Sequence, residues 1–179
     1  DLCLLGWDSL FENDFAGFRE QGLTPARVAL EDKHAYWVLT EHGDLPAAVA
    51  GKLLHQRASD ADLPKVGDWV AVAVRPNENK AVIHAVLPRR TRVARKVAGR
   101  EIEEQVLAAN IDTAFVVQAL DLSFSPRRLE RFLVMVHEGG AKPVVVLNKT
   151  DLCDSLNARL AEARLAAGSA PVVAACASG

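Results

Sequence analysis

Residues 143–151, Pro-Val-Val-Val-Leu-Asn-Lys-Thr-Asp, decide the fold of this chain. The first five residues form an apolar run of strand length, which is typical of a strand buried in a parallel sheet. The residues that follow, 152–167, indicate a helix. An amide, a cation and a carboxylate (Asn148, Lys149 and Asp151) therefore lie just beyond the carboxyl end of a buried strand. Open α/β sheets bind their ligands at this place.

The tetrad Asn148-Lys149-Thr150-Asp151 has the chemistry to recognise guanine. Guanine presents N1–H and the N2 amino group as adjacent donors, and an ionised Asp151 accepts from both. Asn148 would reach the N7/O6 edge, while the aliphatic stem of Lys149 would cover the ring. Adenine would leave the carboxylate unpaired, a mismatch that lowers binding roughly 10⁴-fold. The alternative is that Asn148 and Asp151 only make a turn before the next helix.

The composition indicates one or two compact domains, because half of the 179 residues are hydrophobic and the net charge is −2. No apolar run approaches the roughly 20 residues that a membrane span needs, and no signal peptide opens the chain. Cys3, Cys153 and Cys176 include no CxxC pair, which favours reduced thiols and a cytoplasmic location. The five histidines lack the spacing of metal ligands, so no metal site is expected in these residues.

The first half of the chain has the pattern of a helix followed by a small β-barrel. Phe11, Phe15 and Phe18 lie at helical spacing, which predicts an N-terminal helix within residues 1–22. In residues 23–88, short alternating segments are separated by turn residues. The expected strands are residues 27–31, 35–40, 47–54, 69–74 and 81–87. Five short strands in about 65 residues predict a closed barrel of the OB type.

From residue 111 onward, strands alternate with helices. Residues 111–119 form a nearly continuous apolar run. Ser125 and Pro126 then provide an N-cap and a first-turn proline, and Gly139 ends the helix. The strand of residues 143–147, the tetrad and its helix, and a third strand at residues 172–176 follow. This order predicts parallel strands joined by right-handed crossovers in a partial α/β domain over residues 111–179.

Residues 89–110 are expected to link the two halves, and this linker begins with a cluster of cations. The cluster contains Arg89, Arg90, Arg92, Arg95 and Lys96. A basic stretch beside an OB-type barrel is the pattern expected for a phosphate-backbone partner, so these five residues are candidates for RNA binding. The alternative is a solvated linker whose cations pair with the glutamates of residues 101–104.

Several strings of residues along the chain occur together in one known family. They are Leu-Pro-Lys-Val-Gly-Asp-Trp-Val at residues 63–70, Leu-Pro-Arg-Arg at 87–90, Glu-Gln-Val-Leu-Ala-Ala-Asn-Ile-Asp-Thr at 104–113, Arg-Arg-Leu-Glu-Arg-Phe-Leu at 127–133, and the tetrad. Through these strings the chain resembles the N-terminal portion of ribosome small subunit-dependent GTPase A, a family of circularly permuted ribosome-biogenesis GTPases. The combination of strings is specific to that family.

The resemblance implies a factor that binds and hydrolyses GTP in late maturation of the small (30S) ribosomal subunit and docks on rRNA through the OB domain. It implies GTP or GDP as the ligand, with Mg²⁺ as the accompanying ion, and it assigns the binding of the nucleotide to Asn148, Lys149, Thr150 and Asp151. Cys176-Ala177 stands where the family has a Ser-Ala guanine loop, whose backbone would meet guanine O6. The implied partners are the small subunit, its rRNA and GTP; we expect a cytoplasmic monomer without a membrane partner.

In this family a phosphate loop and a zinc-binding domain follow the guanine-recognition segments. The 179 residues contain no GxxxxGK[ST] string and no zinc ligand set. We therefore expect them to be part of a longer protein, to be inactive alone as a GTPase, and to include no catalytic residue. Three strands without their partners would also leave apolar surface exposed. The alternative function is a non-catalytic RNA-binding module on a degenerate α/β domain.

Overall fold

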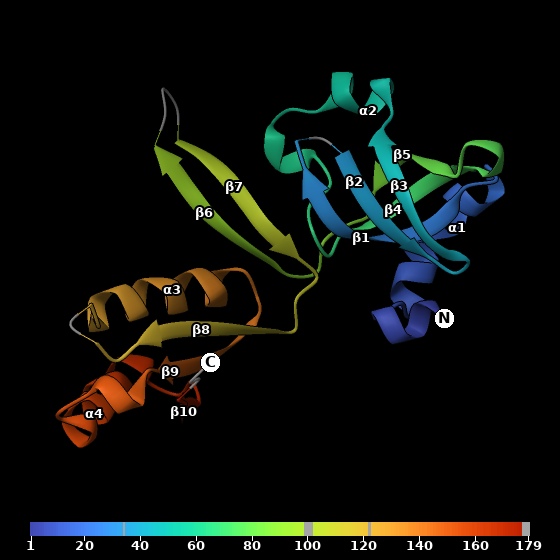
Figure 1. Ribbon diagram of the computed structural model, residues 1–179. Coiled ribbons are helices and arrows are strands. Elements are labelled where there is room, and N and C mark those ends of the chain that lie inside the picture. Colours follow the sequence, from blue (N-terminus) through green and yellow to red (C-terminus); the bar gives the residue numbers. More distant parts are fainter. Residues whose placement is uncertain (34, 99–101, 122, 177–179) are drawn as a thin grey trace. The chain divides into compact units, whose positions relative to one another are not determined.

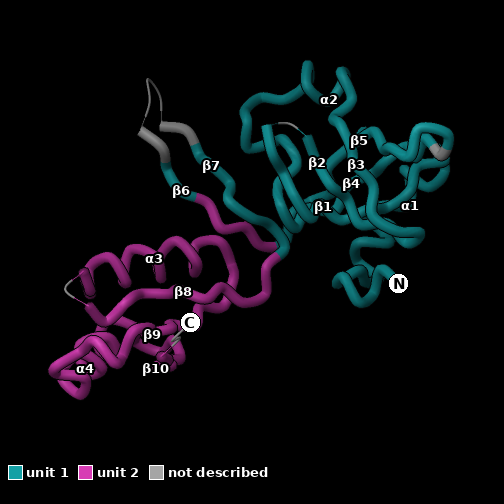
Figure 2. The backbone as a smooth tube through the Cα atoms, in the orientation of Figure 1, with its two compact units in different colours: residues 1–90, 95–110 teal, residues 91–94, 111–179 magenta. Residues whose placement is uncertain are grey.

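The computed structural model describes residues 1–179 except 34, 99–101, 122 and 177–179 (Figure 1). The chain divides into two compact units, residues 1–90 with 95–110, and residues 91–94 with 111–179 (Figure 2). No helix in the described ranges is long and apolar enough to cross a membrane.

The chain begins with a 3₁₀ turn, η1 (Leu2–Leu5), and helix α1 (Ser9–Glu20). Asp8 caps α1, because its carboxylate accepts hydrogen bonds from the backbone N–H groups of Leu10 and Phe11 at 2.9 and 3.2 Å. Phe11 and Phe15 are buried in a cluster with Trp69 of the barrel, as the spacing of the phenylalanines predicts. The helix is thereby packed against the outside of the barrel wall.

Five strands close into a barrel, which confirms the predicted fold class. The strands are β1 (Thr24–Asp32), β2 (Ala35–Thr40), β3 (Gly43–Val49), β4 (Trp69–Arg75) and β5 (Lys80–Val86). They pair in the order β1-β2-β3-β5-β4, with β1 and β4 closing the barrel and only β3 and β5 running parallel. Val28, Val38, Val70 and Ile83 fill the interior.

The predicted strand at residues 47–54 is wrong in its second half. Strand β3 ends at Val49, and the chain continues as helix α2 (Gly51–Gln56) and the 3₁₀ turn η2 (Asp60–Asp62). The stretch Lys-Leu-Leu-His-Gln at residues 52–56 has no alternation of polar and apolar side chains, and lysine, leucine and glutamine are good helix formers. A further 3₁₀ turn, η3 (Pro76–Glu78), joins β4 to β5.

The expected linker at residues 89–110 carries regular structure. Strands β6 (Arg92–Ala98) and β7 (Ile102–Ala109) pair as a two-stranded sheet. The N–H of Ala109 donates to the carbonyl of Val66 at 2.9 Å, and the N–H of Arg92 donates to the carbonyl of Gly139 at 2.9 Å. The charge of this segment led to its interpretation as a linker, although it contains β-branched residues, Val93, Val97, Ile102 and Val106, that favour strands.

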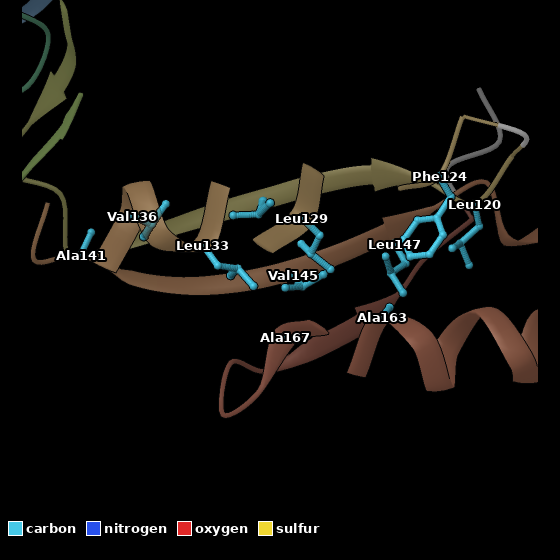
Figure 3. Packing of buried hydrophobic residues seen from close by; sticks show 11 residues of the cluster. Leu120, Phe124, Leu129, Leu133, Val136, Ala141, Val145, Leu147, Ala163 and Ala167 are labelled. Atoms are coloured by element: carbon cyan, nitrogen blue, oxygen red, sulfur yellow. The ribbon is translucent and has the colours of Figure 1, made fainter. Parts of the chain in front are cut away.

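The second unit is a parallel three-stranded sheet in the order β10-β9-β8. Its elements are β8 (Thr113–Ala119), α3 (Pro126–Glu138), β9 (Lys142–Asn148), the 3₁₀ turn η4 (Thr150–Leu152), α4 (Leu156–Ala167) and β10 (Val172–Ala174). Side chains of both helices pack with one face of the sheet around Val145 and Leu147 (Figure 3). The opposite face leaves Phe115 68%, Val117 58% and Val173 50% exposed.

Candidate guanine site and basic hairpin

The loops that follow the three parallel strands are held together at the carboxyl edge of the sheet. The hydroxyl of Thr150, after β9, donates to the carbonyl of Ala175, after β10, at 3.3 Å. The N–H of Ala175 donates to the carbonyl of Leu147, and the N–H of Leu120 donates to the carbonyl of Asn148, each at 2.8 Å. Ligands of parallel sheets bind at this edge, so the tetrad occupies the place that the sequence predicts for a binding site.

Lys149 adopts a left-handed backbone conformation, with φ 58° and ψ 41°. The side-chain oxygen of Asn148 accepts a hydrogen bond from the N–H of Lys149 at 2.8 Å and supports this turn. A left-handed conformation at a residue other than glycine costs on the order of 1–3 kcal/mol, and such strain is concentrated at functional sites. This turn sets the direction of the side chains of the tetrad, and Lys33, Asn79 and Asn110 also have positive φ.

Asp121, just after β8, anchors the amine of Lys149. The Lys149 Nζ lies 3.5 Å from Asp121 Oδ2, and the N–H of Ser123 donates to Asp121 Oδ1 at 2.8 Å. The hydrogen bonds from Ser123, aided by the charge of Lys149, hold the pKa of Asp121 below its ordinary value, so this carboxylate stays ionised. The sequence analysis did not identify Asp121. Its position at the same strand edge as Asp151 is the signal that could have identified it.

Asp151 and Cys176 are brought into contact from positions 25 residues apart. The Cys176 thiol donates to Asp151 Oδ1 at 3.1 Å, and both side chains are exposed. Within the described ranges, no group donates to Asp151 Oδ2. The carboxylate therefore keeps acceptor capacity for the two neighbouring donors of a guanine base. Ala177, the other predicted member of this loop, lies outside the described residues.

The side chains of the tetrad supply groups that can form hydrogen bonds with a ligand. Asn148 provides an amide, Lys149 an aliphatic stem, Thr150 the link to β10, and Asp151 a carboxylate. The part of the chain that the structure describes contains no group of three or more His, Cys, Asp or Glu side chains that could hold a metal ion. No catalytic step is assigned to the residues of the tetrad.

Arg89, the first RNA-binding candidate, is instead part of the barrel structure. Its Nε and Nη2 donate to the two oxygens of Asp68 at 2.8 and 2.7 Å, and further bonds reach the carbonyls of Ala61 and Leu63. The Asp68 side chain is fully buried, and the Arg89 side chain is only 14% exposed. All of its hydrogen-bonding edges face protein, so geometry argues against Arg89 as an RNA contact.

Arg90 is also engaged within its own unit. Its Nη2 donates to Asp8 Oδ1 at 2.6 Å, and its guanidinium lies 3.6 Å from the centre of the Phe11 ring. The hydrogen bond from Arg90 holds the pKa of Asp8 well below its ordinary value. Arg90 thus joins the N-cap of α1 to the end of the barrel, while both side chains of this pair stay partly exposed, at 35% and 46%.

The remaining candidates, Arg92, Arg95 and Lys96, are exposed on strand β6. The Nε of Arg95 donates to the side-chain oxygen of Gln105 on β7 at 2.8 Å, which fixes its position on the hairpin. Because side chains alternate along a strand, Arg92 and Lys96 belong to one face of β6 and Arg95 to the other. The basic residues are therefore carried by a two-stranded sheet rather than by a flexible linker.

Comparison with known proteins gives consistent family matches. The family model described as RsgA GTPase matches residues 86–178. The small ribosomal subunit biogenesis GTPase RsgA of Opitutus terrae is 47% identical over 180 residues, which cover 96% of this chain and 49% of that protein. The protein of the same name from Syntrophotalea carbinolica is 44% identical over 176 residues, covering 94% and 48%. The chain thus spans about half the length of these relatives.

Solved structures share the fold. YjeQ from Thermotoga maritima aligns with a TM-score of 0.62 at 23% identity, covering 86% of this chain and 52% of that chain. YloQ, described as a circularly permuted GTPase, aligns with a TM-score of 0.58 at 19% identity, covering 87% and 52%. A barrel followed by an α/β unit is therefore a fold already seen in solved structures, among them that of YloQ.

Proposed function

The chain belongs to the RsgA GTPase family, and we propose that the intact protein binds and hydrolyses GTP in late maturation of the small (30S) ribosomal subunit in the cytoplasm. Two relatives that match nearly the whole chain are named for small-subunit biogenesis, which supports this assignment. The observation that carries the guanine part is Asp151, an exposed carboxylate at the convergent strand ends with one oxygen that accepts no bond from a described group.

Asp151 would select guanine through a pair of hydrogen bonds. Its two oxygens would accept from N1–H and N2–H₂, as Asn148 approaches the other edge of the base and the stem of Lys149 covers its face. Lys149 is restrained for this role by Asp121, and Thr150 holds the loop against β10. Adenine offers no donors at the corresponding positions, so the carboxylate would lose water without gaining partners.

Hydrolysis would depend on groups beyond this site. GTPases use Mg²⁺ and a phosphate loop to neutralise the charge of the transferred phosphoryl group. We assign the phosphate contacts, the Mg²⁺ ligands and any zinc domain to the remaining half that the relatives possess. For this chain the proposed contribution is the choice of base.

The proposed docking on rRNA uses the barrel and the basic hairpin. Arg92, Arg95 and Lys96 supply cations along β6, and each phosphate contact would release counterions and make binding dependent on salt. Arg89 is removed from this set because a buried carboxylate inside the first unit holds its guanidinium, whereas the partly exposed Arg90 stays in it.

The base code can be tested in the intact protein by replacing Asp151 with asparagine. Titration with mant-GDP and mant-ADP should show a preference for the guanine nucleotide of roughly 10⁴-fold in the wild type. The Asp151→Asn variant should move this preference toward the xanthine nucleotide, because an amide donates to the 2-oxo group of xanthine. Asp154→Asn is the matched control, since it changes an exposed carboxylate three residues away and should leave the preference as it is.

Equal affinity for mant-GDP and mant-ADP would contradict guanine selection and favour the non-catalytic RNA-binding module. Retained GDP binding without a response to xanthine in Asp151→Asn would remove Asp151 from the base site while leaving nucleotide binding in place.

A further inference from the structure

The register of the barrel strands places five residues in one row across its outer wall. Leu30 pairs with Trp37, and Trp37 pairs with Pro46. The parallel pairing of Ala47 with Ala81 sets Pro46 beside Lys80, which pairs in turn with Arg75. This row, Leu30-Trp37-Pro46-Lys80-Arg75, is apolar and aromatic at one end and cationic at the other. It is called the outer row below.

Trp37 stands out among the aromatic residues of the first unit. Its neighbours on β2, Tyr36 and Val38, are buried in the barrel core, so Trp37 faces outward and is 48% exposed. Leu30 beside it is 47% exposed. The other two tryptophans, Trp7 and Trp69, pack in the cluster around α1. Nothing in the described barrel requires a large aromatic side chain at position 37, so its exposed ring is available for a partner.

Small side chains line the next row of the same wall. Ala35 pairs with Ala48, Ala48 lies beside Val82, and Val82 pairs with Ala73. A groove of about 300 Å³ runs along β3 and β5 and is lined by residues that include Pro46, Ala48, Lys80, Val82 and Arg75. The groove therefore follows the cationic half of the outer row, where Glu78 also lines it, and Trp37 is not among its lining residues.

The cationic end of the outer row is open to an anion. Lys80 is exposed and forms no ion pair with any residue that the structure describes. Arg75 pairs with Glu78 at 3.3 Å, but both side chains are more than half exposed. Exposed pairs of this kind contribute little free energy, so a phosphate group can compete with Glu78 for the guanidinium.

We propose that the outer row is a platform for single-stranded RNA, on which one base stacks against Trp37 and the adjoining phosphate contacts Lys80 and Arg75. The inference rests on the rRNA docking proposed above and assigns its position on the barrel. An exposed aromatic ring beside two cations favours RNA as the partner. Proteins that bind single strands without sequence preference stack bases on aromatic side chains and contact the phosphate backbone with basic side chains. A purely hydrophobic partner would leave Lys80 and Arg75 without a role.

The platform can be tested by tryptophan fluorescence of the intact protein with a uridine decamer. Stacking should quench the emission of Trp37, and the Trp37→Phe variant should bind the decamer but lose that component of the quenching. Trp37→Ala should weaken binding roughly 5- to 100-fold, which corresponds to the loss of one stacked base. An abasic strand of equal length, which keeps the phosphates and removes the bases, should bind wild type and Trp37→Ala equally.

Lys80→Ala tests the cationic end without touching the aromatic ring. It should reduce the slope of log K against log salt by about one phosphate contact. Lys142→Ala is its matched control, because Lys142 is an exposed lysine at the start of β9 in the other unit. This pair keeps the proposal testable even if Trp37→Ala fails to fold.

These experiments distinguish RNA binding at the outer row from rRNA docking through the basic hairpin. Loss of RNA binding in an Arg95→Ala/Lys96→Ala variant, with unchanged quenching and affinity in the Trp37 variants, would overturn the platform and leave docking through the hairpin. No binding of the decamer or of small-subunit rRNA by the wild type would overturn both. Guanine selection by Asp151 is unaffected by either result, since its test uses nucleotides alone.

Discussion

The barrel and the three-stranded sheet of this chain solve the burial of apolar surface differently. The barrel pairs its first strand with β4 and fills its interior with its own side chains, so its strands have no open edge in that closed ring. The sheet covers one face with α3 and α4, whose side chains pack around Val145 and Leu147 (Figure 3). Phe115, Val117 and Val173 on the other face are exposed. Both outer strands, β8 and β10, also keep an unpaired edge within the described residues.

The difference follows from the direction of the connections. In the second unit, each crossover steps from one strand to its neighbour in the same direction, β8 to β9 to β10. Crossovers of uniform hand then place both helices on the same face. Covering the other face requires a crossover in the opposite direction or a partner. The barrel thus buries its own apolar side chains, whereas the sheet leaves one apolar face exposed, as a protein interface does.

The largest effect is expected from the buried ion pair that fastens the barrel. Asp68→Asn would leave the guanidinium of Arg89 without its charged partner in a site where Asp68 is fully buried. Breaking a buried pair on one side costs roughly 3–5 kcal/mol of unfolding free energy, a large share of what a domain has. Urea unfolding of the intact protein, followed by the fluorescence of Trp69 inside this unit, would measure the loss.

An exposed pair in the other unit is the control. Glu162→Gln removes the partner of Arg159 on α4, where both side chains are more than 40% exposed. It should change the unfolding free energy by less than about 1 kcal/mol. A loss at Asp68→Asn no greater than that of Glu162→Gln would mean that the closed barrel does not depend on its buried charge.

The second effect concerns the open face of the sheet. Phe115 is 68% exposed in this chain, yet we expect it to be covered in the intact protein, because an apolar strand face of this kind marks an interaction surface. Phe115→Ala should then cost about 3 kcal/mol in the intact protein, as burial of a phenylalanine implies. Chemical denaturation of the intact protein, with a probe in the α/β unit, measures it.

Leu165→Ala supplies the comparison, since Leu165 on α4 is 87% exposed. Its substitution should stay within about 0.5 kcal/mol. Equally small losses of unfolding free energy at Phe115→Ala and Leu165→Ala would show that this face of the sheet is exposed in the intact protein as well. The barrel and the sheet would then differ in the same way in the intact protein.

The periodic parts of both units could be predicted from the sequence. A strand that is buried on one side has apolar residues at every second position. The alternation at residues 35–40 marks β2 with its bounds, and the run before Asn148 marks β9. The hairpin β6–β7 could not be predicted in the same way. Strand β6 carries three cations and only scattered valines, so it lacks a regular alternation, and its charge was interpreted as a sign of a linker.

The same limit applies to the candidate sites. The tetrad was predictable because its residues are contiguous, whereas the contact of Asp151 with Cys176 and of Lys149 with Asp121 depends on which strands are neighbours. Arg89 was predicted to contact RNA because it lies in a basic string, but it forms an ion pair with the buried carboxylate of Asp68. No local sequence pattern reveals that pair. Strand order and burial, which are established only on folding, decide whether such a cation is available to a partner or is paired inside the protein.

The smallest effect, and the one of opposite sign, is expected from Tyr36 in the barrel core. Its hydroxyl is buried and has no hydrogen-bond partner within the described residues, and burial raises the pKa of Tyr36 to about 12. Tyr36→Phe removes this unpaired group while keeping the ring, so it should leave stability at pH 7 unchanged or raise it by about 1 kcal/mol. Thermal unfolding at pH 7 provides the comparison with wild type.

The pH dependence gives the same residue a second and independent readout. Below a pH of about 10 the hydroxyl is protonated in both states, and its ionisation contributes nothing to the slope. Between pH 10 and pH 12 the unfolded chain releases this proton while the folded barrel retains it, so the wild type loses stability as pH rises through that window. Tyr36→Phe should lose less stability over this pH range. The difference between the two plots of unfolding free energy against pH isolates the contribution of Tyr36 from that of lysines, which titrate in the same range. Parallel curves from pH 9 to pH 12 would show that the hydroxyl ionises equally in the folded and unfolded states, and that burial in the barrel does not raise its pKa.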